Sequence, residues 1–500
     1  MQVKVQTGPK ILKNFEDYLQ ETDEVGYIAS VVHSIVYISG LPGAHLREMV
    51  IAEGGQKGIV QSLLPDLVEV LMLDTKDIKN GLRVVRTNEP FKIPVSSGIL
   101  GRVVNAFIAP VDGGGPIMGE RQYMSIDESA PGLGKRVRIT KPLETAVTLV
   151  DLLVPIGYGQ RELVVGDKKT GKTVLLLQLI ANQASKGTIC VYVSIGKRQS
   201  DVRNVENYLR KVGVMNNCVL LVASSADPAT MVYLAPFSGF TIAEFFRDSG
   251  HDVIIVLDDL STHAKFYREI SLLSKRAPGR ASYPGDIFHL HAALLERAGN
   301  IKGPGGGAVS ITALPVAETL EGDLTGYIQT NLMAMTDGHI FFDIDEFRRG
   351  ARPAINHALS VSRVGNQTKS PLERQIAQEL REALLRYKRD QEIARFGVEL
   401  PETTRAEIDL GEKIEQILNQ DMETLVQRPL QLILVGLLLS GFWRDKNASL
   451  LKVDVIKLTQ KYNKGDLKEI VRQVINVEKL DDLIGLIKIN GQEIMGVLYA

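Results

Sequence analysis

Eight consecutive residues match the pattern of a phosphate-binding loop, G-x-x-x-x-G-K-S/T. Its glycines let backbone N–H groups surround phosphate oxygens, and the helix that follows presents the positive end of its dipole. The lysine of this pattern is expected to reach the β- and γ-phosphates of a nucleotide, and the threonine hydroxyl is expected to ligate Mg²⁺. The predicted nucleotide-binding residues are Gly166, Asp167, Lys168, Lys169, Thr170, Gly171, Lys172 and Thr173.

A match of eight residues can arise by chance, so its surroundings matter. Residues 161–165 read as a buried strand immediately before the loop, and residues 174–184 read as an apolar helix immediately after it. This strand–loop–helix order is the setting that a phosphate-binding loop requires, and it makes the motif specific.

Nucleotide sites of this type also need an acidic residue at the end of a neighbouring strand. Residues 253–257 form an apolar strand, and Asp258 and Asp259 follow it. Asp258 is expected to hold Mg²⁺, directly or through water. Asp259 is either a second ligand or the N-cap of a helix predicted at residues 260–273.

The elements around these residues change type along the chain. Residues 8–20 form an amphipathic stretch with Ile11, Leu12, Phe15 and Leu19 on one stripe. Short β-type runs separated by turn residues follow and predict a small barrel. From about residue 150 to 345, apolar strands alternate with helices, which indicates a parallel sheet covered on both faces. Helix formers dominate from Pro371 onward.

These patterns predict a multidomain α/β protein. The expected parts are an N-terminal helical segment (1–24), a six-stranded β-barrel (25–95), a P-loop nucleotide-binding domain (96–366) and a C-terminal helical domain (367–500).

The bulk composition excludes some classes of protein. The formal net charge of the 500 residues is -1, so a dedicated nucleic-acid binder is not expected. Cys190 and Cys218 lie in apolar runs and are expected to be buried thiols. The longest apolar stretch, residues 430–443, is short for a membrane span, and no export signal is recognisable at the N-terminus. We therefore expect any membrane association to go through partner proteins.

Ten segments of the chain resemble the α subunits of F-type ATP synthases. The similarity runs from about residue 25 to 400 and is weaker in the last hundred residues. The segments that carry it are Gly98-Ile-Leu-Gly-Arg-Val-Val-Asn, Pro155-Ile-Gly-Tyr-Gly-Gln-Arg-Glu-Leu, Tyr233-Leu-Ala-Pro-Phe-Ser-Gly, Phe245-Phe-Arg-Asp, Asp258-Asp-Leu-Ser, Pro278-Gly-Arg, Tyr283-Pro-Gly-Asp-Ile-Phe, Leu294-Leu-Glu-Arg, Arg352-Pro-Ala-Ile-Asn and Ser360-Val-Ser-Arg-Val-Gly.

The resemblance implies a RecA-like central domain and an alternating ring of three α and three catalytic β subunits. Each α subunit of the family holds ATP or ADP with Mg²⁺ without turning it over. Arg363 is expected to enter the catalytic site of the neighbouring β subunit as an arginine finger, with Ser360 helping to position it.

Further partners and a location follow from the same resemblance. They are a γ central stalk, and a peripheral stalk of δ and b subunits that the N-terminus contacts. Contact with the membrane would be made only through the embedded sector, which couples ATP synthesis to proton transport. The expected location is the cytoplasmic face of a bacterial plasma membrane, with an organellar inner or thylakoid membrane as the alternative.

One departure from the catalytic relatives concerns the residue that activates water. Those relatives carry Gly-Glu-Arg after the strand that follows the P-loop helix, whereas this chain has Gly196-Lys197-Arg198. A charged lysine cannot act as a general base, so the chain is expected to be non-catalytic. The family's α subunits usually have glutamine at this position, and Lys197 therefore departs from them as well.

Other differences concern the nucleotide site. The family's P-loop interior usually reads Asp-Arg-Gln-Thr, while this chain has lysines at positions 168 and 169. Arg352 and Pro353, which the family places beside the base, are kept. Of two glutamines near the adenine, only Gln420 has a counterpart here, and Met422 takes the second place.

Two other classes compete with the α-subunit interpretation. A catalytic homohexameric ATPase, such as a secretion motor or an RNA translocase, would need a carboxylate at position 197. A free-standing nucleotide-binding protein without rotary partners stays open. His289 and His291 could suggest a metal, but no third ligand is evident and a structural role is favoured.

Overall fold

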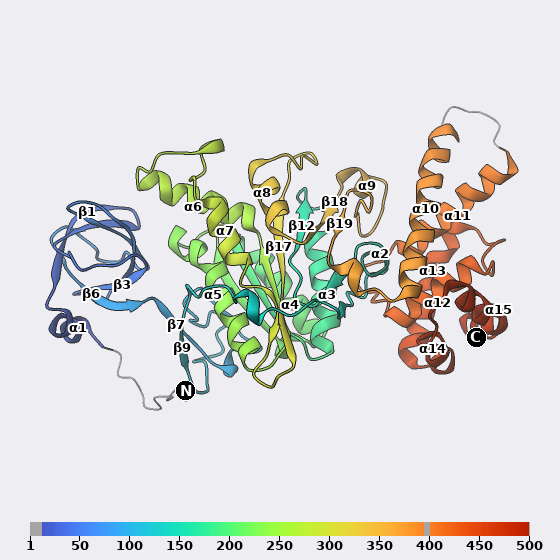
Figure 1. The fold of residues 1–500 in the computed structure, drawn as a ribbon, viewed down its shortest axis with the longest axis horizontal. Coiled ribbons are helices and arrows are strands. Elements are labelled where there is room, and N and C mark those ends of the chain that lie inside the picture. Colours follow the sequence, from blue (N-terminus) through green and yellow to red (C-terminus); the bar gives the residue numbers. More distant parts are fainter. Residues whose placement is uncertain (1–12, 395–400, 500) are drawn as a thin grey trace.

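The computed structural model describes residues 13–394 and 401–499. Figure 1 shows three bodies in a row: a barrel, a central sheet with helices on its faces, and a group of helices at the far end. This architecture confirms the predicted order of barrel, parallel-sheet nucleotide-binding region and helical C-terminal region. The divisions at residues 24, 95 and 366 stay predictions.

Six antiparallel strands close the N-terminal barrel in the order β1-β2-β5-β4-β3-β6, which leaves no free strand edge. Val36, Val50 and Val70 point inward and are fully buried. An ion pair between Arg276 and Glu69 (2.8 Å) joins the barrel to the central body. The strands are β1 (Val25–Val32), β2 (Ile35–Ser39), β3 (Glu48–Ala52), β4 (Lys57–Leu63), β5 (Val68–Met72) and β6 (Arg83–Pro90).

The helix α1 (Phe15–Thr22) packs against the barrel. It begins at Phe15 because the side chain of Asn14 accepts a hydrogen bond from the backbone N–H of Asp17, and Asp17 accepts one in return. The amphipathic stretch predicted at residues 8–20 is therefore helical from residue 15 and continues two residues further. Residues 8–12 of that prediction lie outside the described residues.

The central sheet has the strand order β19-β18-β12-β17-β15-β13-β14-β8, with β16 (Gly299–Lys302) added antiparallel to β17. The strands from β18 to β8 are parallel, and β19 lies antiparallel to β18. Parallel strands end at the same edge, so their C-terminal residues converge there. The strands are β8 (Val103–Val104), β12 (Glu162–Gly166), β13 (Ile189–Lys197), β14 (Cys218–Ser224), β15 (Val253–Asp258), β17 (Ala308–Glu318), β18 (Gly338–Phe342) and β19 (Val361–Ser362).

Two small ladders lie beside the main sheet. One pairs β7 (Lys92–Val95) with β9 (Gln122–Ser125), and the other pairs β10 (Pro142–Leu143) with β11 (Ile156–Gly157). Within the main sheet, Cys190 and Cys218 are register neighbours on β13 and β14 and are buried free thiols, as predicted.

Helices cover both faces of the sheet, as its uninterrupted apolar strands require. One of them, α5, is long and apolar enough to cross a membrane by length and composition. About 72% of its most apolar window is buried inside this protein, so we interpret it as a core helix. The helices are α2 (Thr148–Leu153), α3 (Lys172–Ser185), α4 (Gln199–Lys211), α5 (Ala229–Asp248), α6 (Leu260–Leu273), α7 (Ile287–Leu295), α8 (Tyr327–Met335) and α9 (Ile344–Arg348).

The C-terminal helices share one hydrophobic core with a face of the central sheet. Leu176 of α3 and Leu430 of α12 both belong to it and are fully buried. The apolar stretch predicted to be a buried helix is α12 and its continuation to Trp443. The helices are α10 (Pro371–Ala394), α11 (Glu402–Leu418), α12 (Arg428–Leu439), α13 (Ala448–Lys464), α14 (Lys468–Val474) and α15 (Leu480–Tyr499).

A buried histidine pair links two helices of the central body. Nδ1 of His263 on α6 lies 3.0 Å from Nε2 of His291 on α7, and Nε2 of His263 donates to the carbonyl of Tyr233 (2.9 Å). That carbonyl can only accept, so Nδ1 of a neutral His263 accepts from His291. His289 is exposed. No group of three possible metal ligands occurs among the described residues. The buried contact of His291 with His263 supports the structural role expected for His291.

The histidine pair makes the protein sensitive to mild acid. Burial lowers the pKa of His263 to about 4, and it lowers the pKa of His291 well below the ordinary value. The unfolded chain takes up these protons near pH 6.5 and the folded chain does not, so stability is complete above pH 6.5 and falls as the pH approaches 4. We expect His263 to cost about 1.5 kcal/mol of unfolding free energy between pH 6.5 and 5, and His291 to lower the unfolding free energy in the same direction.

Urea unfolding at these two pH values measures the effect. The variant His263→Gln should lose part of the difference between them, and His289→Gln, at an exposed neighbouring position, should keep all of it. An unchanged pH difference in a folded His263→Gln variant would contradict the assignment.

Candidate functional site

The predicted phosphate-binding loop connects the end of β12 to the start of α3. Gly166 has φ 154°, and a Cβ built there would lie 2.4 Å from the carbonyl oxygen of Phe342. Gly171 has φ 108° and caps the N-terminus of α3. Both positions therefore require glycine, and the resulting turn directs the first N–H groups of α3 toward the loop interior.

The side chain of Lys172 lies against the backbone of the phosphate-binding loop. Nζ of Lys172 donates to the carbonyl oxygens of Gly166 (2.7 Å) and Asp167 (2.6 Å). Burial lowers the pKa of Lys172, and the charges of Glu318 and of Asp258 oppose that shift. The ammonium is thus held at the centre of the loop and close to the strand ends.

The remaining loop residues divide into anchors and exposed groups. The carboxylate of Asp167 accepts from Thr319 Oγ1 (2.5 Å) and from the N–H of Gly322 (3.0 Å), which fastens the loop to the segment after β17. Thr170 is buried, and its hydroxyl donates to the carbonyl of Asp167 (2.8 Å). The exposed members are Lys168, Lys169 and Thr173.

The two aspartates after β15 share a lysine from the neighbouring strand. Nζ of Lys197, the last residue of β13, lies 2.9 Å from Oδ1 of Asp258 and 2.9 Å from Oδ2 of Asp259. Oδ2 of Asp258 accepts from the hydroxyl of Tyr192 (2.6 Å). Oδ1 of Asp259 accepts from the N–H of Thr262 (2.6 Å), so Asp259 is the N-cap of α6, one of its two predicted roles.

Electrostatics keep this lysine charged. Burial alone would lower the pKa of Lys197, but the two carboxylates outweigh burial and raise its pKa well above the ordinary value. An ammonium in this state neither accepts a proton nor activates water.

The arrangement does not fit the expected magnesium ion at Asp258. One oxygen of this carboxylate accepts from Tyr192, and the other contacts Lys197. Mg²⁺ needs near-octahedral oxygen ligands with several waters of its own, and an ammonium already stands on the free side of the carboxylate. Thr173 is exposed at the loop and stays available as a ligand. The geometry therefore disagrees with direct ligation of Mg²⁺ by Asp258, while a role through water stays a prediction.

Arg352 and Pro353 lie in the segment after α9. Arg352 places its guanidinium 3.9 Å from the ring centroid of Phe347, and Nη1 donates to the carbonyls of Phe347 (3.0 Å) and Ala351 (2.7 Å). The carbonyl of Arg352 accepts from the backbone N–H of Gln420 (2.5 Å). The structure thus brings Arg352 and Gln420 together, although 68 positions separate them in the sequence.

The side chain of Gln420 is engaged inside the protein. Its oxygen accepts from the N–H (3.0 Å) and the hydroxyl (3.1 Å) of Thr148, and its nitrogen donates to the carbonyls of Ala146 (2.6 Å) and Thr424. These contacts use the whole hydrogen-bonding capacity of the amide. Gln420 consequently joins the helical region to the central body, and its amide has no capacity left for a hydrogen bond to a base in this geometry. The expectation that Gln420 lies near the adenine stays a prediction.

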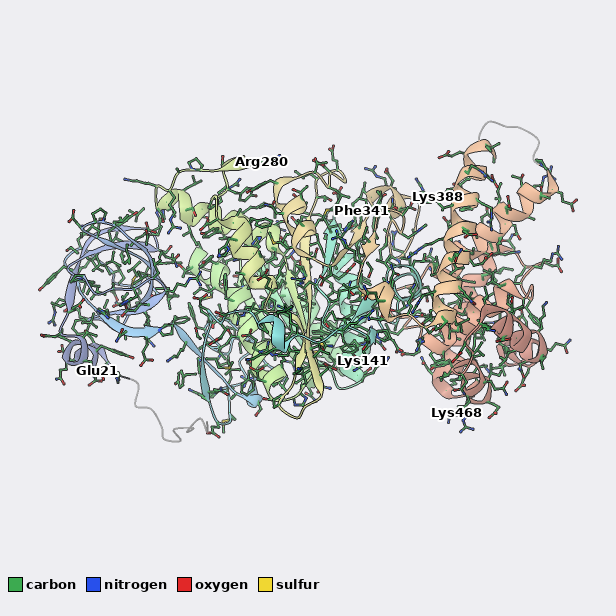
Figure 2. The ribbon with its side chains drawn as sticks, viewed as in Figure 1. Glu21, Lys141, Arg280, Phe341, Lys388 and Lys468 are labelled. Carbon is green, nitrogen blue, oxygen red and sulfur yellow. The ribbon has the colours of Figure 1, made fainter. Side chains whose placement is uncertain are left out.

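Ser360 and Arg363 lie at the edge of the sheet, around β19. The hydroxyl of Ser360 accepts from the N–H of Phe341 (3.0 Å) and donates to the carbonyl of Asn356 (2.7 Å), which ties this segment to β18. Phe341 is labelled in Figure 2, in the upper part of the central body. The side chain of Arg363 is exposed and makes no hydrogen bond or ion pair with another described residue.

Sequence reasoning missed two partners at the strand ends. The hydroxyl of Tyr192 and the carboxylate of Glu318 lie near Asp258 and Lys172, respectively. A signal for Tyr192 existed, because it lies on β13 beside β15 and adjacent parallel strands place their ends together.

Comparisons with known proteins agree with this geometry. The nucleotide-binding domain of the ATP synthase alpha/beta family matches residues 146–362, and the C-terminal domain of the ATP synthase alpha/beta chain matches residues 367–485. The ATP synthase subunit alpha of Neorickettsia sennetsu is 39% identical over 444 residues, covering 87% of each chain. The ATP synthase subunits alpha of Dictyoglomus turgidum and Dictyoglomus thermophilum are each 40% identical over 443 residues, covering 88% of this chain and 87% and 86% of theirs. With a phosphate-binding loop at the edge of a parallel sheet, this chain therefore belongs to the ATP synthase alpha/beta family, among its alpha subunits.

Proposed function

We propose that this chain is the non-catalytic, nucleotide-binding α subunit of an F-type ATP synthase, and that it supplies Arg363 to the catalytic site of an adjacent β subunit. The observation that carries the non-catalytic role is the contact of Lys197 with Asp258 and Asp259, each at 2.9 Å. A catalytic site would need a free carboxylate near the terminal phosphate to orient and activate water.

The carboxylates close to the loop are engaged in other contacts. Asp258 and Asp259 share Lys197, and Glu318 faces Lys168 at 3.4 Å. The intact loop with Lys172 therefore supports binding, while the paired carboxylates speak against turnover. The same contacts disfavour a catalytic homohexameric ATPase.

The exposed edge of the sheet supports the role proposed for Arg363. Its guanidinium is exposed next to β19, and Ser360 holds the preceding segment against β18. A planar cation presented in this way can meet the charge that develops on a phosphoryl group in a neighbouring subunit.

The proposed partners follow from membership of the family. They are catalytic β subunits in an alternating ring, a γ central stalk, and δ and b subunits at the N-terminus, where residues 1–12 lie outside the described residues. The complex would couple ATP synthesis to proton transport, with the chain peripheral at the cytoplasmic face of a bacterial plasma membrane. The bound cofactor would be ATP or ADP. The net charge of -1 supports the absence of a nucleic-acid partner.

The first test measures binding and turnover separately on the purified chain. We expect equilibrium ATP binding together with hydrolysis far below about 10 per second, the median rate for enzymes. The reason is that Lys197 stands where the catalytic relatives have a glutamate, and a charged lysine cannot act as the general base. The variant Lys197→Glu, which restores the residue type of the catalytic relatives, provides a comparison. Sustained turnover at enzyme rates by the unmodified chain would refute the non-catalytic role.

The second test removes the cation of the loop. Lys172→Ala should weaken ATP binding roughly 10- to 100-fold, because a charge-assisted hydrogen bond to phosphate contributes about 1.5–3 kcal/mol. Lys186→Ala, at the other end of α3, is the matched control and should bind normally. In the assembled complex, hydrolysis should persist in part, and its complete loss would mean that this site is itself catalytic.

The third test concerns Arg363. Arg363→Ala, assembled with unmodified partners, should lower turnover of the complex by roughly 10³- to 10⁵-fold, while nucleotide binding by this chain and assembly stay nearly unchanged. Arg363→Lys should restore little, because a point charge does not reproduce the planar fork. Arg348→Ala, at an exposed position of α9, is the control. If an assembled Arg363→Ala complex turned over ATP at the normal rate, the guanidinium would have no catalytic role and the proposal for Arg363 would be wrong.

A further inference from the structure

Lys197 is directed to its position by the end of strand β13. Gly196, with φ +64°, precedes it, and the pairing of β13 with β14 shifts register between Ile195 and Lys197. A Cβ at Gly196 would lie 2.7 Å from Cγ2 of Thr262 and 3.0 Å from the ring of Phe266. The close approach of α6 therefore requires glycine here, and the next side chain turns toward the two aspartates.

The ammonium of Lys197 contacts one oxygen of each of the two carboxylates. This ammonium has three donors, and two of them point at Asp258 and Asp259. The two aspartates are 5% and 0% exposed. Without a cation, they would be buried charges with little solvation, which is strongly unfavourable. The lysine thus supplies the neutralisation that a divalent cation beside Asp258 would otherwise provide.

Displacement of this lysine by a metal would be costly. An ammonium moved away from two buried carboxylates loses both contacts, and the incoming Mg²⁺ would have to give up water to replace them. Further positive charge is available near the phosphates without a metal. Lys172 lies beneath the loop, and Lys169 is exposed on it. Lys168 is exposed as well, and its ammonium contacts Glu318 at 3.4 Å.

We infer that Lys197 takes the place of Mg²⁺ beside Asp258, so that this site binds a nucleoside di- or triphosphate in its metal-free form. The inference rests on the proposed nucleotide binding and specifies its ligand. The phosphate charge is met by the lysines of the loop and by the N-terminus of α3, while Asp258 and Asp259 remain paired with Lys197.

The test is equilibrium binding of ATP to the purified full chain, once with excess Mg²⁺ and once with EDTA. The dissociation constant of the unmodified chain should differ by less than about threefold between the two conditions, because its carboxylates are already neutralised. Lys197→Gln, which restores the residue usual in the family, should bind at least about tenfold more tightly with Mg²⁺ than without it. Lys211→Gln, at an exposed position of α4, should behave like the unmodified chain.

Electron paramagnetic resonance with Mn²⁺ in place of Mg²⁺ provides a second measurement. The unmodified chain with ATP should immobilise little Mn²⁺, and Lys197→Gln with ATP should immobilise about one ion for each nucleotide bound. The measurements on the unmodified chain decide the inference even if the variant does not fold. ATP binding that needs Mg²⁺ would overturn the inference and leave the proposed function standing, whereas no ATP binding in either condition would overturn both.

Discussion

The parallel register of the central sheet is the constraint on which the site depends. Ser194 of β13 is paired with Asp258 of β15, and Gly166 of β12 is paired with Glu318 of β17. Each strand turns into its loop at the same level, so side chains from four separate segments meet at one edge. The register of the strands is therefore enough to bring together the loop, the two aspartates and Lys197.

Charge at that edge is balanced inside the protein. Removing one partner from a buried ion pair generally costs about 3–5 kcal/mol, because the other charge is left without solvation. Lys197 lies between two such carboxylates, and Tyr192 occupies a further acceptor site on one of them. The geometry of the strand ends is therefore coupled to the identity of residue 197, even though this residue is not part of the phosphate-binding loop.

The sequence predicts features that depend on neighbouring residues and misses those set by distant contacts. The loop at residues 166–173 and the cap at Asp259 are local, and both were predictable from composition and spacing. The pairing of Lys197 with the two aspartates and the anchoring contacts of Gln420 were not, because their partners come from other segments, about 60 and 270 residues away. Gln420 illustrates the limit, since the resemblance implies only a place near the adenine and does not predict that the amide binds Thr148. The role proposed for Arg363 involves another chain, so it stays a prediction.

The shared hydrophobic core of α3 and the C-terminal helices has a mechanical consequence. Gln178 of α3 donates to the carbonyl of Asp421 (3.0 Å), and Gln427 donates to Asn182 of the same helix (2.8 Å). These bonds and the core behind them tie the helical region to the helix that begins with Lys172. A close-packed protein interior has low compressibility, so a displacement on one side of it is transmitted to the other. A displacement of the C-terminal helices would therefore shift α3, and with it the phosphate-binding loop from which α3 begins.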